Sequence, residues 1–211
     1  MDLFDTPGEE LPASDTPRPL ADRLRPRLLA DVIGQRQILG PEAPLTVMLK
    51  ANALGSIILW GPPGVGKTTI ARLLAKETHL KFVQISAIFS GVPELRKVFQ
   101  AAQNRRDNGQ GTLLFVDEIH RFNKAQQDSF LPLMEDGTLV LVGATTENPS
   151  FELNAAVLSR AQVLVLERLS DDELKLLAQR AETEAGSDLP LDAGARRALL
   201  EMADGDGRSL L

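Results

Sequence analysis

A glycine-rich stretch, GPPGVGKTT, runs from Gly61 to Thr69 and fits the spacing G-x-x-x-x-G-K-[ST]. It lies between the apolar stretch SIILW and a helical pattern, which is the strand-to-helix context that this spacing requires. Glycines let the backbone curl so that its N–H groups point at phosphate oxygens, and the N-terminus of the following helix adds partial positive charge. The predicted phosphate-binding residues are Gly61, Pro62, Pro63, Gly64, Val65, Gly66, Lys67, Thr68 and Thr69. Lys67 should reach the β- and γ-phosphates of a nucleotide, and Thr68 should hold Mg²⁺ through its hydroxyl.

Two adjacent acids, Asp117 and Glu118, end the apolar stretch that precedes HRFNKAQQD. Carboxylates are costly to bury without a partner, so we expect Mg²⁺ and Lys67 to compensate them. Side chains alternate along a strand, so the two acids should point in different directions and serve different partners. Asp117 is predicted to bind Mg²⁺, and Glu118 to polarise the water that attacks ATP. For the neighbouring His120 we favour a structural role over a contact with nucleotide-dependent loops or DNA.

Apolar stretches alternate with helical patterns through the centre of the chain. Strands are predicted over residues 56–60, 81–86, 111–118, 138–146 and 162–168, and helices over 43–54, 67–78, 93–106 and 124–136. Short apolar strands separated by helices imply right-handed crossovers and a parallel sheet covered on both faces. The predicted fold class is therefore α/β.

The composition changes near both ends of the chain. Residues 1–18 are rich in proline and acids and have little apolar periodicity, so they are predicted to be a flexible arm. Residues 19–169 are predicted to form the α/β domain and residues 170–211 an all-helical subdomain. Ser170 and Glu173 fit a capping box at the start of its first helix, and a second helix is expected over 193–203. Because no helix-ending signal precedes Leu211, we expect this subdomain to be cut short.

The overall composition excludes several classes of function. The 211 residues carry a net charge of −6, which argues against a broadly basic surface, so any nucleic-acid surface must be local or lie outside this chain. The absence of cysteine excludes disulfides and thiol catalysis, and two histidines are too few to suggest a zinc site. The N-terminus lacks a signal peptide, and no apolar run is long enough to cross a bilayer. A cytoplasmic protein without a membrane partner is expected.

Several motifs together resemble those of the AAA+ ATPases. They are the phosphate loop, LLFVDEIH, GATTEN (residues 143–148), LSRAQ around Arg160, and GDGRSLL around Arg208. Their order is closest to that of the clamp loaders. HRFNKAQQD and GATTENPSFELN are further similar to the family of replication-associated recombination protein A, whose eukaryotic counterpart is the Werner-helicase-interacting protein. This resemblance covers about residues 19–211 and implies the AAA+ P-loop fold with a helical lid.

The resemblance also implies roles for individual residues. Arg25, Ile33 and Gly34 match the segment that lines the adenine pocket, and Arg208 matches the second sensor in the lid. Thr146 matches the first sensor, with Thr145 and Asn148 as alternatives in the same polar run. Arg160 matches the arginine finger, which reaches into the site of a neighbouring subunit and stabilises charge on the transferred phosphoryl group. Glu118, Lys67, Thr146 and Arg160 are thus the predicted catalytic residues.

The function implied by the resemblance is a DNA-dependent ATPase that acts at stalled or gapped replication forks. Its cofactors would be ATP and Mg²⁺, and its implied partners are DNA with single-stranded gaps, ends or forks, a single-stranded DNA-binding protein, and further copies of itself. Members of the family carry an additional C-terminal region that assembles tetramers, and they are associated with the nucleoid. The arginines at positions 18, 23, 25 and 27 could touch DNA phosphates.

Two alternatives remain at this stage. The first is a clamp-loader-like scaffold that recruits replication proteins and in which ATP switches assembly. The second, ranked last, is a protein unfoldase, in which Phe89 would have to matter for turnover of a protein substrate, whereas packing at a helix entry is the simpler interpretation of that residue. The terminal MDLF resembles the end of peptides that dock on the sliding clamp, but a disordered arm is the favoured interpretation.

Overall fold

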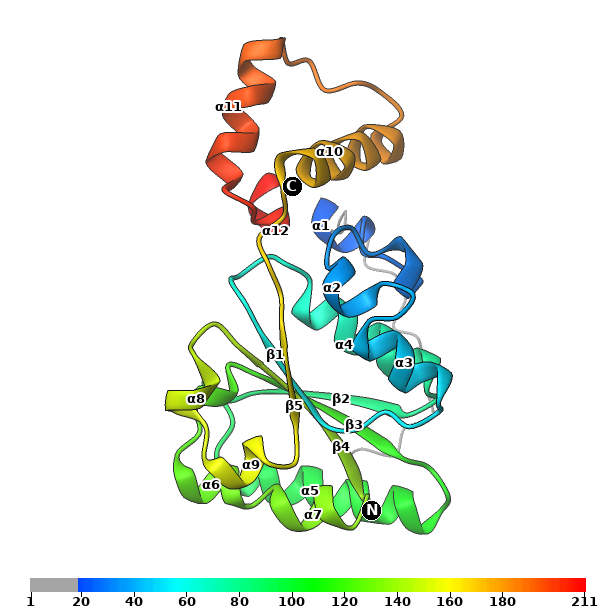
Figure 1. Cartoon of the computed structure of the whole chain (residues 1–211), viewed down its shortest axis with the longest axis vertical. Coiled ribbons are helices and arrows are strands. Elements are labelled where there is room, and N and C mark those ends of the chain that lie inside the picture. Colours follow the sequence, from blue (N-terminus) through cyan, green and yellow to red (C-terminus); the bar gives the residue numbers. More distant parts are fainter. Residues whose placement is uncertain (1–18) are drawn as a thin grey trace, which may run out of the picture.

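The structure is a computed structural model that describes residues 19–211, so Arg18 and the MDLF terminus lie outside the described residues. The elements run along the chain as follows: α1 (Leu20–Arg23), η1 (Leu29–Asp31), α2 (Arg36–Leu39), α3 (Pro44–Lys50), β1 (Ile57–Trp60), α4 (Lys67–Glu77), β2 (Lys81–Ser86), α5 (Val92–Asp107), β3 (Thr112–Asp117), η2 (Ile119–Arg121), α6 (Lys124–Asp128), α7 (Leu131–Glu135), β4 (Leu139–Thr145), α8 (Pro149–Glu152), α9 (Ala155–Leu158), β5 (Gln162–Val165), α10 (Asp171–Ala185), α11 (Ala193–Ala203) and α12 (Gly207–Leu210) (Figure 1).

The five strands form one parallel sheet in the order β2-β3-β4-β1-β5. β4 lies between β1 and β3, so the ends of those two strands are separated by one strand, about 10 Å. The predicted parallel α/β fold is confirmed. Its consequence for the site is that the carboxyl ends of all the strands meet at one edge of the sheet.

Alternate side chains of the strands point into two separate cores. Ile57 and Leu59 pack in one core with residues of α2, α3 and α4, whereas Ile58 faces a second core with residues of α5, α7 and α9. Figure 1 shows these two helical layers on either side of the sheet. Burial of both strand faces explains why the strands are almost continuously apolar in sequence.

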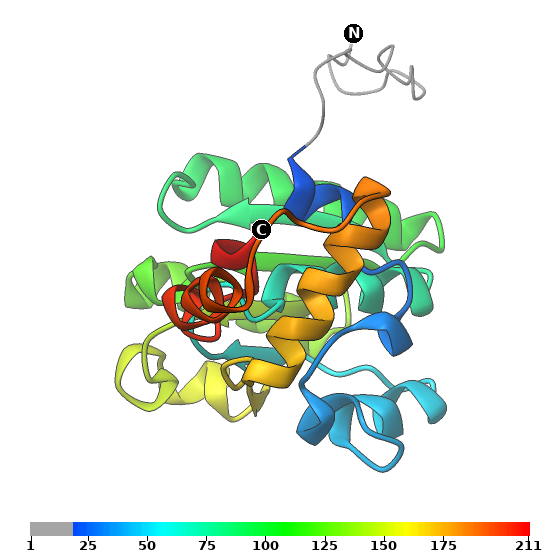
Figure 2. The same cartoon turned by 90° about the horizontal axis from the view of Figure 1, so that it is seen from above.

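The helices α10, α11 and α12 pack on one another beyond the end of the sheet, at the top of Figure 1 and in front of the sheet in Figure 2. The predicted capping box is present, because Ser170 accepts from the Glu173 N–H and the Glu173 carboxylate accepts from the Ser170 N–H. α12 begins with Asp206 as its N-cap, so Arg208 lies in the first turn of that short helix.

Two predicted helices are wrong in extent. The helix predicted over residues 43–54 ends at Lys50, because Asn52 adopts the left-handed conformation (φ 50°), which stops α-helical propagation. The helix predicted over 124–136 is two helices, α6 and α7. Pro132 lacks an N–H and its ring would clash with the carbonyl four residues earlier, so one continuous helix cannot form there.

Within residues 19–211, none of the helices combines the length and the apolar character needed to cross a membrane.

Phe130 is one of the largest fully buried side chains, and it lies in the core between the sheet and α5. Its ring is fully buried and contacts Phe99 edge-on at 5.4 Å and Phe122 at 5.9 Å between ring centres. Phe130→Ala is therefore expected to lower the free energy of unfolding by about 3–5 kcal/mol, measured by chemical denaturation. The matched control is Phe89→Ala, because Phe89 is 86% exposed and its truncation should change stability by less than about 0.5 kcal/mol. Equal losses in the two variants would contradict this account of the core.

Candidate nucleotide-binding site

The phosphate loop leaves β1 at Gly61 and enters α4 at Lys67. Gly64 and Gly66 have φ of +71° and +98°, a region that a residue with a side chain enters only with strain, so glycine is needed at both turns. The Lys67 ammonium is buried and donates to the carbonyls of Gly61 and Pro62, both at 2.7 Å. Burial lowers the pKa of Lys67, and the carboxylates of Glu118 and Asp117 oppose that shift. Additional negative charge in this loop would therefore stabilise the ammonium.

The reason given for different directions of the two acids is wrong, because only Asp117 belongs to β3. Asp117 is the last residue of the strand, and Glu118 lies outside it in the left-handed conformation, with φ of +53°. Strand alternation therefore does not apply to this pair, and both residues line the same cleft. Lys67 forms no ion pair with either acid in the described part of the chain, yet both carboxylates act on its charge and counter the lowering of its pKa by burial, so Lys67 compensates them through space without direct contact. Glu118 instead lies 3.3 Å from His120 Nδ1.

The three candidates for the first sensor, at and after the end of β4, lie in three different environments. Thr145 ends the strand, is fully buried, and is bonded to His120 and to the backbone of Glu147. Thr146 lines the same cleft as the phosphate loop. The side chain of Asn148 accepts from the Ser150 N–H as the N-cap of α8. Of the three candidates for the first sensor, Thr146 is therefore the one that lines the cleft.

These elements surround one cleft of about 690 Å³, within the size range of pockets that bind small molecules. Its walls come from the chain around α1 and η1, the phosphate loop with the start of α4, the ends of β3 and β4, and the helices α10 and α12. The predicted site residues that line it are Arg25, Ile33, Pro63, Gly64, Val65, Gly66, Lys67, Thr68, Thr69, Asp117, Glu118, Thr146 and Arg208. The structure therefore brings together residues that are widely separated in sequence.

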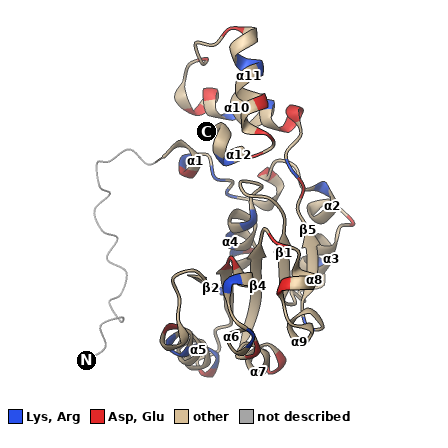
Figure 3. Cartoon of the chain, turned by 90° about the vertical axis from the view of Figure 1, so that its left-hand side faces the viewer, with Lys and Arg blue, Asp and Glu red and all other residues tan. Residues whose placement is uncertain are grey.

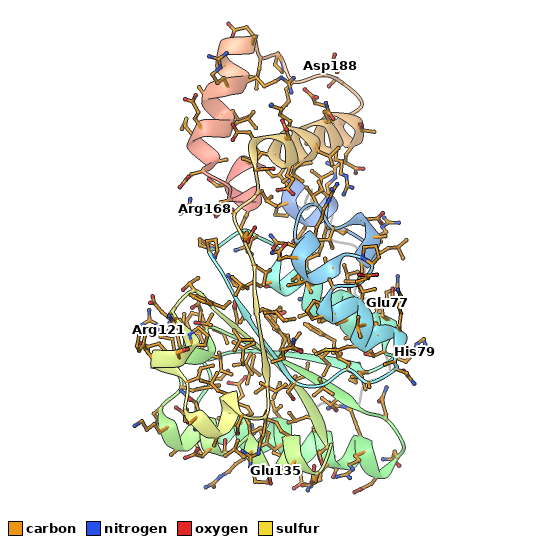
Figure 4. All side chains as sticks on the ribbon, in the orientation of Figure 1. Glu77, His79, Arg121, Glu135, Arg168 and Asp188 are labelled. Atoms are coloured by element: carbon orange, nitrogen blue, oxygen red, sulfur yellow. The ribbon has the colours of Figure 1, made fainter. Side chains whose placement is uncertain are left out.

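Four predicted residues lie outside the cleft lining. Gly61 and Pro62 begin the loop, and their carbonyls accept hydrogen bonds from Lys67. Gly34 (φ +75°) packs against Leu169 and Glu173. Arg160 is partly exposed and donates from Nε to Glu135 at 2.6 Å. Glu135 lies at the end of the molecule opposite the α10–α12 helices (Figure 4). Arg160 therefore does not reach the nucleotide cleft of its own subunit in this structure.

The packing interpretation of Phe89 is also wrong. The ring is 86% exposed, and its neighbour Ile88 is 58% exposed, so the loop after β2 presents apolar side chains to solvent. A loop residue next to a helix start gives no periodic signal that would separate these two cases in sequence.

Several residues at the site were not predicted, and three of them make polar or close contacts there. Arg180 of α10 lines the cleft and donates to the Asp31 carbonyl at 2.6 Å, which ties the helical part to the segment around η1. The carboxylate of Asp206 lies against Gly64, so close that a Cβ at that glycine would overlap it. His120 is the third. Of these three, only Asp206 has a sequence signal: an acid before GRSL is typical of a helix N-cap, which predicts its place at the start of α12.

The cleft has the groups that a magnesium nucleotide requires. Gly64 and Gly66 leave the loop free of side-chain bulk, and Lys67 follows at the start of a helix. The Thr68 hydroxyl and the Asp117 carboxylate line the same cleft, and both are oxygen ligands of the kind that Mg²⁺ prefers. Mg²⁺ is usually held by one or two carboxylates, phosphates and water, so two protein ligands are sufficient.

A phosphate loop between β1 and α4, with paired acids one strand away, defines the class of P-loop nucleotide-binding proteins. Residues 57–169 match the family described as "ATPase family associated with various cellular activities (AAA)". The chain belongs to this family of ATPases, as the sequence motifs predicted.

Two relatives and one solved structure narrow the comparison. Replication-associated recombination protein A of Escherichia coli K12 is 48% identical over 94% of this chain and 46% of its own length. The ATPase WRNIP1 of Dictyostelium discoideum is 44% identical over 90% of this chain and 22% of its own. Thermotoga maritima RuvB, a Holliday junction branch migration motor, superposes with a TM-score of 0.70 at 27% identity, covering 89% of this chain and 62% of RuvB. The predicted resemblance is confirmed, and the chain spans less than half the length of either relative.

Proposed function

We propose that this chain is the ATPase part of a DNA-dependent ATPase that acts at stalled or gapped replication forks. The observation that carries the proposal is the convergence of Lys67, Asp117, Glu118 and Thr146 on one cleft beside the phosphate loop. This combination provides phosphate binding, metal binding and a base for water, which together are the requirements of phosphoryl transfer to water.

In the proposed reaction each residue has one task. The loop N–H groups and Lys67 hold the β- and γ-phosphates, and Thr68 and Asp117 hold Mg²⁺. The Glu118 carboxylate accepts the proton of the attacking water, while Thr146 orients that water or the γ-phosphate. The apolar side chains of Val32, Ile33 and Leu177 in the cleft wall are suited to the adenine ring. Bound Mg²⁺ supplies neutralisation of the charge on the phosphates.

We further propose that residues 170–211 act as a lid over an α/β domain of residues 19–169. Arg208 of α12 lines the cleft, and its positive charge acts on Lys67. The Asp206 carboxylate lies against the phosphate loop at Gly64. Like charges repel, so the lid should shift when a triphosphate enters and should bring Arg208 toward the phosphates.

The position of Arg160 supports hydrolysis between subunits. Its guanidinium is partly exposed, is held by Glu135, and does not line the cleft of its own chain. An arginine finger has to leave such an arrangement and enter a neighbour's site, so the proposed active form is a homo-oligomer.

Support for DNA as the activating partner comes from the relatives. The Escherichia coli relative is named for replication-associated recombination, and the Dictyostelium discoideum relative is named as an ATPase. The RuvB structure is described as a Holliday junction branch migration motor. Acidic and basic residues both occur on α5 and α11 (Figure 3), so a DNA surface on this chain would be local. A single-stranded DNA-binding protein is a further proposed partner.

The test is steady-state ATP hydrolysis with gapped DNA, forked DNA, intact duplex and no DNA, at fixed ionic strength. The proposal predicts that gapped or forked DNA raises turnover and that intact duplex does so much less. If hydrolysis occurs but no DNA alters it, the fork ATPase is contradicted, and an ATP-switched scaffold for replication proteins becomes the better account.

A further inference from the structure

His120 connects the ends of two neighbouring strands. It follows β3 in η2, and its side chain is 5% exposed. Nδ1 lies 2.9 Å from Thr145 Oγ1 at the end of β4 and 3.3 Å from Glu118 Oε2. We propose that His120 is a positioning residue that holds the Glu118 carboxylate in the cleft and ties it to β4. This inference rests on the role of Glu118 in the proposed function.

The chemistry of the three groups favours a hydrogen on His120 Nδ1. An ionised carboxylate only accepts hydrogen bonds, so the contact with Glu118 is attractive only if His120 Nδ1 carries a hydrogen. Thr145 Oγ1 can then accept from Nδ1 while its own hydrogen points to the Glu147 carbonyl, 3.2 Å away. With this assignment the Nδ1 hydrogen bonds to Thr145, and its positive end also faces the Glu118 carboxylate 3.3 Å from Nδ1. If Nδ1 were bare, Thr145 would donate to it, and Glu118 would face a lone pair.

Glu118 needs such a partner because its backbone does not fix its side chain. The residue follows the strand in the left-handed conformation, and its side chain is 27% exposed at the cleft. A freely rotating carboxylate would spend little time in the one orientation that accepts a proton from the attacking water. Thr145, by contrast, is fully buried and held by the Glu147 backbone, so it is a fixed point.

The same connection reaches the predicted first sensor. Thr145 precedes Thr146, which lines the cleft, so a shift at the end of β4 moves both residues. His120 then transmits that shift to Glu118. The orientation of the base is thereby coupled to the strand end that contacts the nucleotide.

The test begins with kinetics of ATP hydrolysis in three variants. His120→Ala should lower kcat by about 10- to 100-fold with KM for ATP unchanged, because only the orientation of the base is lost. His120→Asn, whose amide can donate from near the Nδ1 position, should recover most of that loss. In a Glu118→Gln background, His120→Ala should have no further effect, since both changes remove the same function. The control is His79→Asn on the exposed turn after α4, which should leave turnover unchanged.

A measurement that needs no hydrolysis separates this inference from the proposed function. The chain has two histidines, so ¹⁵N NMR of the His79→Asn variant reports His120 alone. The inference predicts a hydrogen on Nδ1 and a change in that signal in Glu118→Gln. A bare Nδ1, or an unchanged signal, overturns the inference whether or not the protein hydrolyses ATP. A further loss of turnover from His120→Ala in the Glu118→Gln background also overturns it, because His120 would then act independently of Glu118.

Discussion

Glutamine in place of Glu118 is expected to lower the kcat of ATP hydrolysis by about 10²- to 10⁴-fold. The amide has the shape of the carboxylate but cannot accept the proton of the attacking water. The phosphate loop, Thr68 and Asp117 are unchanged, so the variant should still bind Mg·ATP. Measurement of both turnover and nucleotide affinity separates loss of the base from loss of binding.

The matched control for this variant is Glu77→Gln. Glu77 is an exposed glutamate at the end of α4, away from the cleft, so the same chemical change there should leave turnover intact (Figure 4). Full activity in Glu118→Gln would remove Glu118 from the mechanism. A loss of nucleotide affinity equal to the loss of turnover would assign it a binding role instead.

Removal of the Arg160 guanidinium should lower the kcat of ATP hydrolysis by a similarly large factor, because Arg160 is proposed to act in the site of a neighbouring subunit. Arg160→Ala is expected to lower kcat in the oligomer by about 10³- to 10⁵-fold, the usual contribution of an arginine finger. Nucleotide binding should persist, because Arg160 does not line the cleft of its own chain. The control Arg197→Ala removes an exposed arginine from α11 and should leave turnover unchanged.

Mixed oligomers provide the decisive comparison for Arg160. When Arg160→Ala subunits assemble with Glu118→Gln subunits, some interfaces pair an intact Glu118 with an intact Arg160. Part of the lost activity should then return on mixing. If mixing restores nothing although mixed oligomers form, Arg160 does not act in a neighbouring site.

Local motifs made the phosphate loop, the paired acids and the parallel sheet predictable from sequence. Each depends on residues close in the chain, or on the strong alternation of apolar strands with helices. The break between α6 and α7 also has a sequence signal, because Pro132 cannot continue a helix, although residues 124–136 were predicted as one helix.

Contacts between distant residues were not predictable in this way. The bond from His120 to Thr145 spans 25 residues and depends on the left-handed turn at Glu118, which no propensity of glutamate favours. The approach of Asp206 to Gly64 arises only when α12 packs beside the phosphate loop. Likewise, whether Phe89 is buried or exposed depends on which elements pack beside its loop, and the sequence near Phe89 does not show this.

Calorimetric titration of Mg·ATP into the chain and into Lys67→Ala tests the central claim most directly. The account predicts saturable binding that depends on Mg²⁺ in the unaltered chain, with a large loss of affinity in Lys67→Ala while the fold is kept. Within residues 19–211, the Lys67 ammonium makes hydrogen bonds only to two loop carbonyls, so its removal should act mainly on the phosphates. Equal affinities in the two proteins, or no binding in either, would contradict the assignment of this cleft as the ATP site.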